Sequence, residues 1–164
     1  MLLCGIDEAG RGPLAGPVTA SAVILPETFP HEELRDSKRL SAAARARLET
    51  AIRTGALAWA IGWASHLEID RLNVLAASHL AMRRALRGLG VTPDETIVDG
   101  SIVPDLGVPV RALVKADASI PAVMAASILA KTARDRWMEA YARLEPGYEY
   151  ERHKGYPTPR HRKL

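Results

Sequence analysis

The sequence contains very little cysteine: Cys4 is the only one among 164 residues. One thiol cannot form an internal disulfide, and no other feature suggests an exported protein, so we expect a cytoplasmic location. The chain also offers no pair of cysteines and no closely spaced pair of histidines. A zinc site is therefore disfavoured.

Long hydrophobic runs are absent as well. No apolar stretch approaches the ~18–20 uninterrupted residues that a membrane-spanning helix needs. The segment Met1–Ile6 is apolar, but Asp7 and Glu8 end it, and it lacks the basic start and the length of a secretory signal. There is no internal repeat and no low-complexity linker. We therefore expect one compact domain without a membrane partner, and a monomer.

The composition that remains is that of a globular protein, with 48% hydrophobic and 25% charged residues. The net charge is +3, but the last stretch is distinctly basic and has Glu151 as its only acid. It contains Arg152, Lys154, Arg160, Arg162 and Lys163. Such a block often attracts polyanions such as nucleic acids, although a solvated tail has the same composition. We expect one domain over residues 1–145 and a short basic segment over residues 146–164, packed on it or extending from it.

Apolar runs separated by turn formers predict alternating strands and helices. Strands are expected at Leu2–Ile6, Val18–Leu25, Ala56–Ala64, Glu95–Asp99 and Val108–Val114. Helices are expected from the Ser41 cap to about Arg53, from a capping box at Ser65 through a second cap at Asn73 to Gly88, and from Pro121 to about Leu144. Glycines and prolines between the first two strands predict a hairpin. A hairpin followed by alternating elements indicates an α/β domain, with a mixed sheet covered by helices.

Four acidic residues stand where strands are predicted to end. Asp7 and Glu8 end the first strand, Asp99 ends the fourth, and Asp117 lies between the fifth strand and the last helix. Strand ends are where α/β folds place their sites, because loops converge there over a rigid sheet. If these ends meet, the carboxylates stay ionised only with cations between them, which suits Mg²⁺ or Mn²⁺. Each acid taken alone could equally be a turn former or a helix cap.

The glycine-rich turn after Glu8 contains Gly10-Arg11-Gly12. Glycines let the backbone approach an anion closely, and arginine adds a charged fork for phosphate. Taken alone, the same residues are more simply a hairpin turn with an exposed arginine. Polar side chains at Asp36-Ser37-Lys38, Ser127 and Lys131 could contact a nucleic-acid backbone, but each is a weak signal by itself.

Six blocks follow one another in an order that resembles a known family. They are Gly5-Ile6-Asp7-Glu8-Ala9-Gly10-Arg11-Gly12-Pro13-Leu14-Ala15-Gly16-Pro17-Val18; Asp36-Ser37-Lys38 with Leu40-Ser41; Ile69-Asp70 with Asn73; Val98-Asp99-Gly100; Lys115-Ala116-Asp117 with Ala125-Ala126-Ser127-Ile128, Ala130-Lys131 and Arg134-Asp135; and His153-Lys154-Gly155-Tyr156 with Thr158 and His161. This series covers nearly the whole chain and resembles ribonuclease HII, the type 2 ribonuclease H family.

The resemblance implies a ribonuclease H-like fold, a five-stranded mixed sheet flanked by helices. It implies that Asp7, Glu8, Asp99 and Asp117 are catalytic and hold two divalent ions, Mg²⁺ or Mn²⁺. The implied substrates are RNA–DNA hybrids and DNA duplexes containing single ribonucleotides, cut on the 5′ side of the ribonucleotide to leave 3′-hydroxyl and 5′-phosphate ends. Gly10, Arg11 and Gly12 would read the ribose 2′-hydroxyl. Tyr156 would stack beside the next sugar, and Lys38, Ser127 and Lys131 would contact the substrate.

Two departures and two alternatives accompany this reading. Ala116 stands where many bacterial members carry glycine, and the chain stops at Leu164 where relatives usually continue. We expect a missing C-terminal segment to weaken duplex binding or stability while leaving the four carboxylates intact.

A junction resolvase of related fold is one alternative function, although it has no use for a 2′-hydroxyl sensor. A module that clamps hybrids without cutting them is the other.

Overall fold

A five-stranded sheet forms the centre of the computed structural model, which describes residues 1–11, 16–35 and 39–144. The strands are β1 (Leu3–Ala9), β2 (Val18–Ile24), β3 (Ala58–Ala64), β4 (Glu95–Asp99) and β5 (Val110–Leu113), and they lie in the order β3-β2-β1-β4-β5. β1 and β2 form the expected antiparallel hairpin, and β3 adds antiparallel to β2. β4 runs parallel to β1, and β5 runs parallel to β4. The predicted mixed sheet is confirmed.

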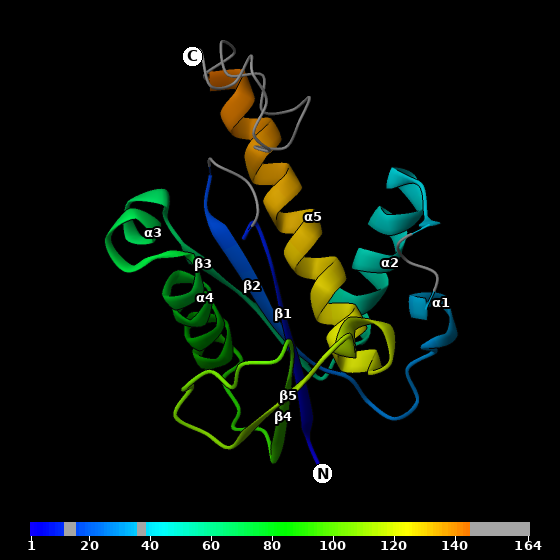
Figure 1. Ribbon diagram of the computed structural model, residues 1–164. Helices are drawn as coiled ribbons and strands as arrows, with labels where there is room; N and C mark the ends of the chain where they lie inside the picture. The colour runs from blue at the N-terminus through cyan, green and yellow to red at the C-terminus, as the bar shows by residue number, and fades with distance from the viewer. Residues whose placement is uncertain (12–15, 36–38, 145–164) are drawn as a thin grey trace.

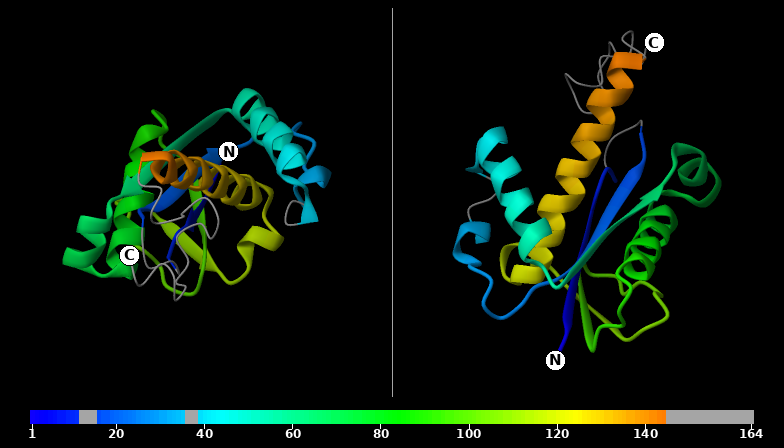
Figure 2. Two further views of the ribbon diagram at one scale, coloured as in Figure 1. Left: turned by 90° about the horizontal axis from the view of Figure 1, so that it is seen from above. Right: turned by 180° about the vertical axis from the view of Figure 1, so that it is seen from behind.

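Helices cover both faces of this sheet (Figures 1 and 2). They are α1 (Glu32–Arg35), α2 (Ala42–Gly55), α3 (His66–Leu72), α4 (Val74–Gly88), the short 3₁₀ helix η2 (Ala116–Ala118) and α5 (Pro121–Leu144). α3 and α4 lie on one face, where α4 packs against β2 and β3. α5 crosses the other face against β1 and β2, with α2 and α1 beside it. The strand β2, between these layers, is buried along its whole length.

Capping residues set the starts of three helices. The Ser41 hydroxyl accepts a hydrogen bond from the backbone N–H of Ala44 at 3.2 Å and opens α2. Ser65 and Glu68 form the predicted capping box of α3. Asn73 ends α3 and begins α4, since its side chain accepts a hydrogen bond from the Ala76 N–H at 2.9 Å. These local signals were readable from the sequence because each involves residues three positions apart.

The start of α5 approaches β1 very closely at Gly5. A β-carbon added to Gly5 would lie 2.3 Å from the backbone carbonyl carbon of Ala122 and from the backbone nitrogen of Val123. Real β-carbons do not come this near to backbone atoms, so only glycine permits this packing. The contact holds α5 against β1 two residues before Asp7.

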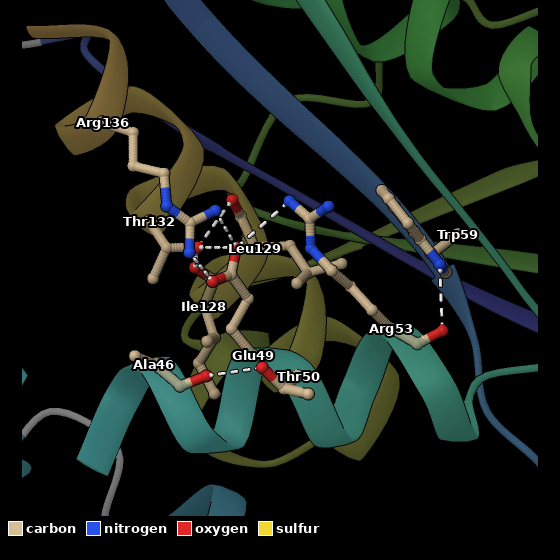
Figure 3. A network of polar contacts seen from close by, with 9 residues as sticks. All are labelled: Ala46, Glu49, Thr50, Arg53, Trp59, Ile128, Leu129, Thr132 and Arg136. Atoms are coloured by element: carbon tan, nitrogen blue, oxygen red, sulfur yellow. Dashed lines mark hydrogen bonds and ion pairs between the residues drawn. The ribbon is translucent and has the colours of Figure 1, made fainter. Parts of the chain in front are cut away.

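A buried carboxylate joins α2 to α5 (Figure 3). Glu49 on α2 is 2% exposed and accepts hydrogen bonds from Arg136 and from the Thr132 hydroxyl on α5, the latter at 3.1 Å. Arg53, one turn further along α2, lies 3.1 Å from the same carboxylate and stacks over the Trp59 ring at 4.4 Å. This arrangement, which we call the Glu49 clamp (Glu49, Arg53, Thr132 and Arg136), fixes the position of α2 along α5.

The structure differs from the predicted elements at several ends. β1 continues through Ala9, three residues beyond the predicted apolar run, so that Asp7 and Glu8 pair with Ser21 and Ala20 of β2 inside the strand. The predicted fifth strand is shorter, and neither α1 nor η2 was predicted. The basic segment 146–164 lies outside the described residues. None of the helices in the described ranges combines the length and the apolarity needed to cross a membrane.

Candidate active site

Three of the four predicted carboxylates meet at one edge of the sheet. Asp7 lies near the end of β1, Asp99 ends β4, and Asp117 lies in η2, directly after β5. Because β1, β4 and β5 run parallel to one another, their carboxyl ends share an edge. One carboxylate oxygen from each of the three residues lies within 4.8 Å of the other two. We call this group the acidic cluster (Asp7, Asp99 and Asp117).

A hydrogen bond from a backbone N–H to a side chain links the connection after β5 to the end of β4. The Ala116 N–H donates to Asp99 Oδ1 at 2.9 Å. Lys115 adopts a left-handed conformation, with φ of 60°, which costs a residue with a side chain about 1 kcal/mol. The chain thereby turns sharply after β5, and Asp117 reaches the cluster two residues later.

Asp7 is the most buried member of the acidic cluster, at 6% exposure. The pKa of Asp7 is raised to about 8, first by burial and then by the charges of Glu8, Asp99 and Asp117. A hydrogen bond from the Glu8 N–H to Asp7 Oδ1, 2.9 Å long, opposes it. The surroundings of Asp7 therefore disfavour its negative charge unless a cation is near.

Glu8 lies beside the acidic cluster but outside the 4.8 Å group. Burial raises the pKa of Glu8, while the charge of Arg11 and its hydrogen bond lower it in part. Arg11 Nη1 lies 3.4 Å from Glu8 Oε1. The other oxygen, Oε2, is buried and has no hydrogen-bond partner among the described residues. This place therefore offers one buried acceptor atom that no donor of the described residues satisfies.

The donor set fits a hard divalent cation. Carboxylate oxygens are the ligands that Mg²⁺ and Mn²⁺ prefer, and three carboxylates within 4.8 Å repel one another without a cation. The raised pKa of Asp7 and the unpartnered oxygen of Glu8 agree with such a site. Asp7, Asp99 and Asp117 could therefore hold a metal ion, with Glu8 next to them.

The residues predicted to contact a substrate lie partly beside this site. Gly10, Ser127 and Lys131 line one groove of about 560 Å³ between the end of β1 and α5, together with Glu8 and Ala9. Arg11 is exposed at the near end of the same turn. Gly12, Lys38 and Tyr156 lie outside the described residues.

Two arginines to which the sequence analysis assigned no role also line this groove. Arg134 on α5 is 3% exposed, and its Nε donates to the Pro17 carbonyl at 2.9 Å. It lies so close to the turn that a β-carbon on Gly10, where φ is +100°, would be 2.3 Å from this Nε. Arg45 lines the groove from α2. Arg134 stood inside one of the sequence blocks, whereas Arg45 lies in a run typical of an ordinary helix and gave no signal.

A solved structure shows the same fold. Ribonuclease H2 from Pyrococcus horikoshii OT3 superposes with a TM-score of 0.80 at 29% identity, covering 99% of this chain and 84% of that chain. The mixed sheet, its two helical layers and the acidic cluster at the strand ends define a nuclease of the ribonuclease H-like fold.

Sequence comparisons place the chain more narrowly within that class. The family model described as Ribonuclease HII matches residues 4–164. The chain is 58% identical over 162 residues to ribonuclease HII of Laribacter hongkongensis, covering 97% of this chain and 81% of the relative. It is 56% identical over 160 residues to ribonuclease HII of Azoarcus sp., covering 98% and 78%. The chain belongs to the ribonuclease HII family, and its activity is that of a ribonuclease H, a hydrolytic endonuclease.

Proposed function

We propose that this protein hydrolyses the phosphodiester on the 5′ side of ribonucleotides, both in RNA–DNA hybrids and at single ribonucleotides embedded in duplex DNA. The products are 3′-hydroxyl and 5′-phosphate ends. The observation that carries the proposal is the acidic cluster, in which Asp7, Asp99 and Asp117 converge within 4.8 Å. Family membership supports ribonuclease H chemistry at this place.

Within this proposal, Asp7, Glu8, Asp99 and Asp117 are the catalytic carboxylates and hold two divalent ions, Mg²⁺ or Mn²⁺. Such a pair of ions, when bound, positions a water for in-line attack and stabilises the departing oxygen. The protein contributes a fixed arrangement of oxygens: β1 and β4 hold Asp7 and Asp99, and the Ala116–Asp99 hydrogen bond fixes the approach of Asp117. The buried position of Asp7 keeps bulk water from screening its charge.

The proposed choice of sugar rests on the turn after β1. Arg11 contacts Glu8, so a nucleotide held by Gly10, Arg11 and Gly12 would lie beside the carboxylates. The 2′-hydroxyl is the group that separates RNA from DNA, and closely approaching backbone N–H groups can read it. Lys38, Ser127 and Lys131 are proposed to contact the substrate and Tyr156 to stack beside the following sugar. Ser127 and Lys131 line the groove that adjoins the turn.

The division of the chain is part of the same proposal. Residues 1–145 would form the catalytic domain, and the basic residues 146–164 would add contacts to the duplex. We also propose that the protein acts in the cytoplasm, and that it acts as a monomer, since all three members of the acidic cluster come from one chain.

A substrate panel tests the proposed function. The protein is incubated with an RNA–DNA hybrid, an all-DNA duplex and a branched DNA junction, with Mg²⁺ or Mn²⁺ and then with chelator. We expect cleavage of the hybrid alone, lost on chelation. Equal cutting of the junction would favour a resolvase, and metal-dependent binding without cleavage would favour a non-catalytic clamp.

A further inference from the structure

A second hollow continues the groove beside the acidic cluster along the space between α2 and α5. The first, of about 560 Å³, is lined by Glu8, Gly10 and residues of α5. The second, of about 140 Å³, is lined by Glu49, Thr132 and Arg136 of the Glu49 clamp and by their neighbours on α2 and α5. Three residues line both: Arg45 from α2, and Lys131 and Asp135 from α5. The two hollows therefore meet at two cations and one carboxylate.

Neither cation is engaged elsewhere in the described part of the chain. Arg45 is half-buried and Lys131 is exposed, and neither side chain has a hydrogen bond or ion pair there. The other carboxylate close to Arg45 on α2 is Glu49, one turn further on and therefore on the same side of the helix. Its charge is already met by Arg53 and Arg136. Arg45 thus keeps its charge available to a ligand in the groove.

The Glu49 clamp also fixes where Arg45 lies. Thr132 and Arg136 bind Glu49 from α5, and Lys131 precedes Thr132 in the same helix. Figure 3 shows the side chains of Thr132 and Arg136 reaching across from α5 to Glu49 on α2. Because the clamp sets the register of the two helices, Arg45 and Lys131 are held in opposite walls of one groove instead of moving with a free helix.

We propose that Arg45 and Lys131 together bind a backbone phosphate of the nucleic-acid duplex in this groove, at a point away from the scissile bond. An unpaired guanidinium opposite an unpaired ammonium suits a phosphodiester, because arginine donates in a planar fork and lysine adds a point charge. The groove begins at Glu8 and Gly10, so a duplex engaged by the carboxylates passes along it. This proposal rests on the proposed function and adds Arg45, which no part of it assigns.

The test compares Arg45→Gln with Arg47→Gln, both in an Asp7→Asn background that prevents cutting. Each variant removes one positive charge from α2, but Arg47 is exposed and lies in a different hollow, with Glu33 and Leu40. Binding to an RNA–DNA hybrid is measured between low and high salt. We expect Arg45→Gln to weaken binding by about tenfold and to reduce the slope of log K against log salt by about 0.9, the value for one phosphate contact. Arg47→Gln should change neither.

Controls and contrary outcomes complete the test. Arg45→Lys, which keeps the charge, should restore most of the slope, and thermal unfolding of all variants should match the parent. Equal affinities and slopes for Arg45→Gln and Arg47→Gln would overturn the phosphate site, while hybrid cleavage by the unsubstituted protein would leave the proposed function standing. If the unsubstituted protein neither binds nor cuts the hybrid, both proposals fail together.

Discussion

Among single residues, Asp7 has the surroundings that most disfavour a negative charge. It is buried in the sheet edge, it follows the apolar residues of β1, and it faces three other acids. A buried negative charge without a cation lowers the stability of the fold, so a neutral side chain at this position would be more favourable for stability alone. A bound cation would offset this loss of stability by favouring the charged carboxylate, and cation binding is the role that we propose for Asp7.

Replacing Asp7 by asparagine tests that use at the level of activity. Asp7→Asn keeps the size of the side chain but removes its charge, so we expect hybrid cleavage to fall by more than the ~10–100-fold that is typical of residues supporting a metal ligand. The rate of single-turnover cleavage is the measurement. Asp105→Asn, at an exposed position in the β4–β5 connection, should cut at the parent rate. Substantial residual activity in Asp7→Asn would mean that the metal site is misassigned.

The raised pKa of Asp7 also predicts how stability depends on pH without divalent ions. An acid with a folded-state pKa of about 8, above its ordinary value of 3.8, binds a proton more tightly in the folded than in the unfolded chain. Its contribution to stability is therefore full below about pH 4 and is lost as the pH rises toward about 8. Thermal unfolding in chelator should show this loss between these pH values.

Asp7→Asn should reduce that dependence, because the amide does not titrate. Added Mg²⁺ or Mn²⁺ should stabilise the parent at pH 8 by mass action and stabilise the variant less. A parent protein whose stability in chelator changed with pH in the same way as that of Asp7→Asn would contradict the electrostatic account of the site.

At the scale of elements, the Glu49 clamp is the main polar connection between α2 and α5. Burial alone would raise the pKa of Glu49, but the hydrogen bonds and charges of Arg136, the charge of Arg53 and the Thr132 hydroxyl outweigh it, and the pKa is lowered. The clamp therefore stabilises the fold above the ordinary pKa of 4.5, and this contribution is lost as the pH falls through the lowered value.

Glu49→Gln should destabilise the protein by about 1–3 kcal/mol. Breaking a buried ion pair typically costs about 3–5 kcal/mol, but Arg136 and Arg53 stay partly in contact with water and lose less. Denaturant unfolding at neutral pH measures the change. Glu68→Gln is the matched control, since its ion pair with Arg84 is exposed and glutamine keeps the capping box. A loss no larger than that of the control would show that the clamp does not hold α2 in place.

The elements differ in how far the sequence could predict them. Signals carried by neighbouring residues succeeded: the caps at Ser41, Ser65 and Asn73 are present, and the first residue of α5 is Pro121. The end of β1 was placed too early, because the antiparallel partner β2 extends the strand through Ala9 regardless of the polar residues in it. The end of a strand depends on its pairing with a distant segment, and the sequence of one strand alone does not show that pairing.

The active site likewise combines residues that the sequence could predict with residues that long-range packing brings together. The parallel strands bring Asp7, Asp99 and Asp117 together as the strand-end argument expected. Arg45 was not predicted, because its place beside Lys131 depends on how α2 packs on α5, 86 residues further along the chain. The residue composition of α2 alone does not predict such a contact. Long-range packing is thus the part of this site that sequence patterns do not reach.

At the scale of the whole molecule, the strand order brings all the proposed functional groups to one edge of the sheet. β1 and β4 lie side by side at the centre, the connection after β5 returns to them, and α5 packs along β1 (Figure 1). The carboxylates, the Gly10–Arg11 turn and the α2–α5 groove therefore lie on connected surface. We propose that a duplex contacting the three together is cut on the 5′ side of a ribonucleotide, which is the central claim for this protein.

Mapping the cut in a DNA duplex that contains one ribonucleotide tests that claim most directly. The duplex is labelled at each end in turn, incubated with Mg²⁺ or Mn²⁺, and the products are sized and their end groups determined. We predict a single cut on the 5′ side of the ribonucleotide, with 3′-hydroxyl and 5′-phosphate ends, and none in chelator or in an all-DNA duplex. Cleavage on the 3′ side, or equal cutting of the all-DNA duplex, would contradict the account.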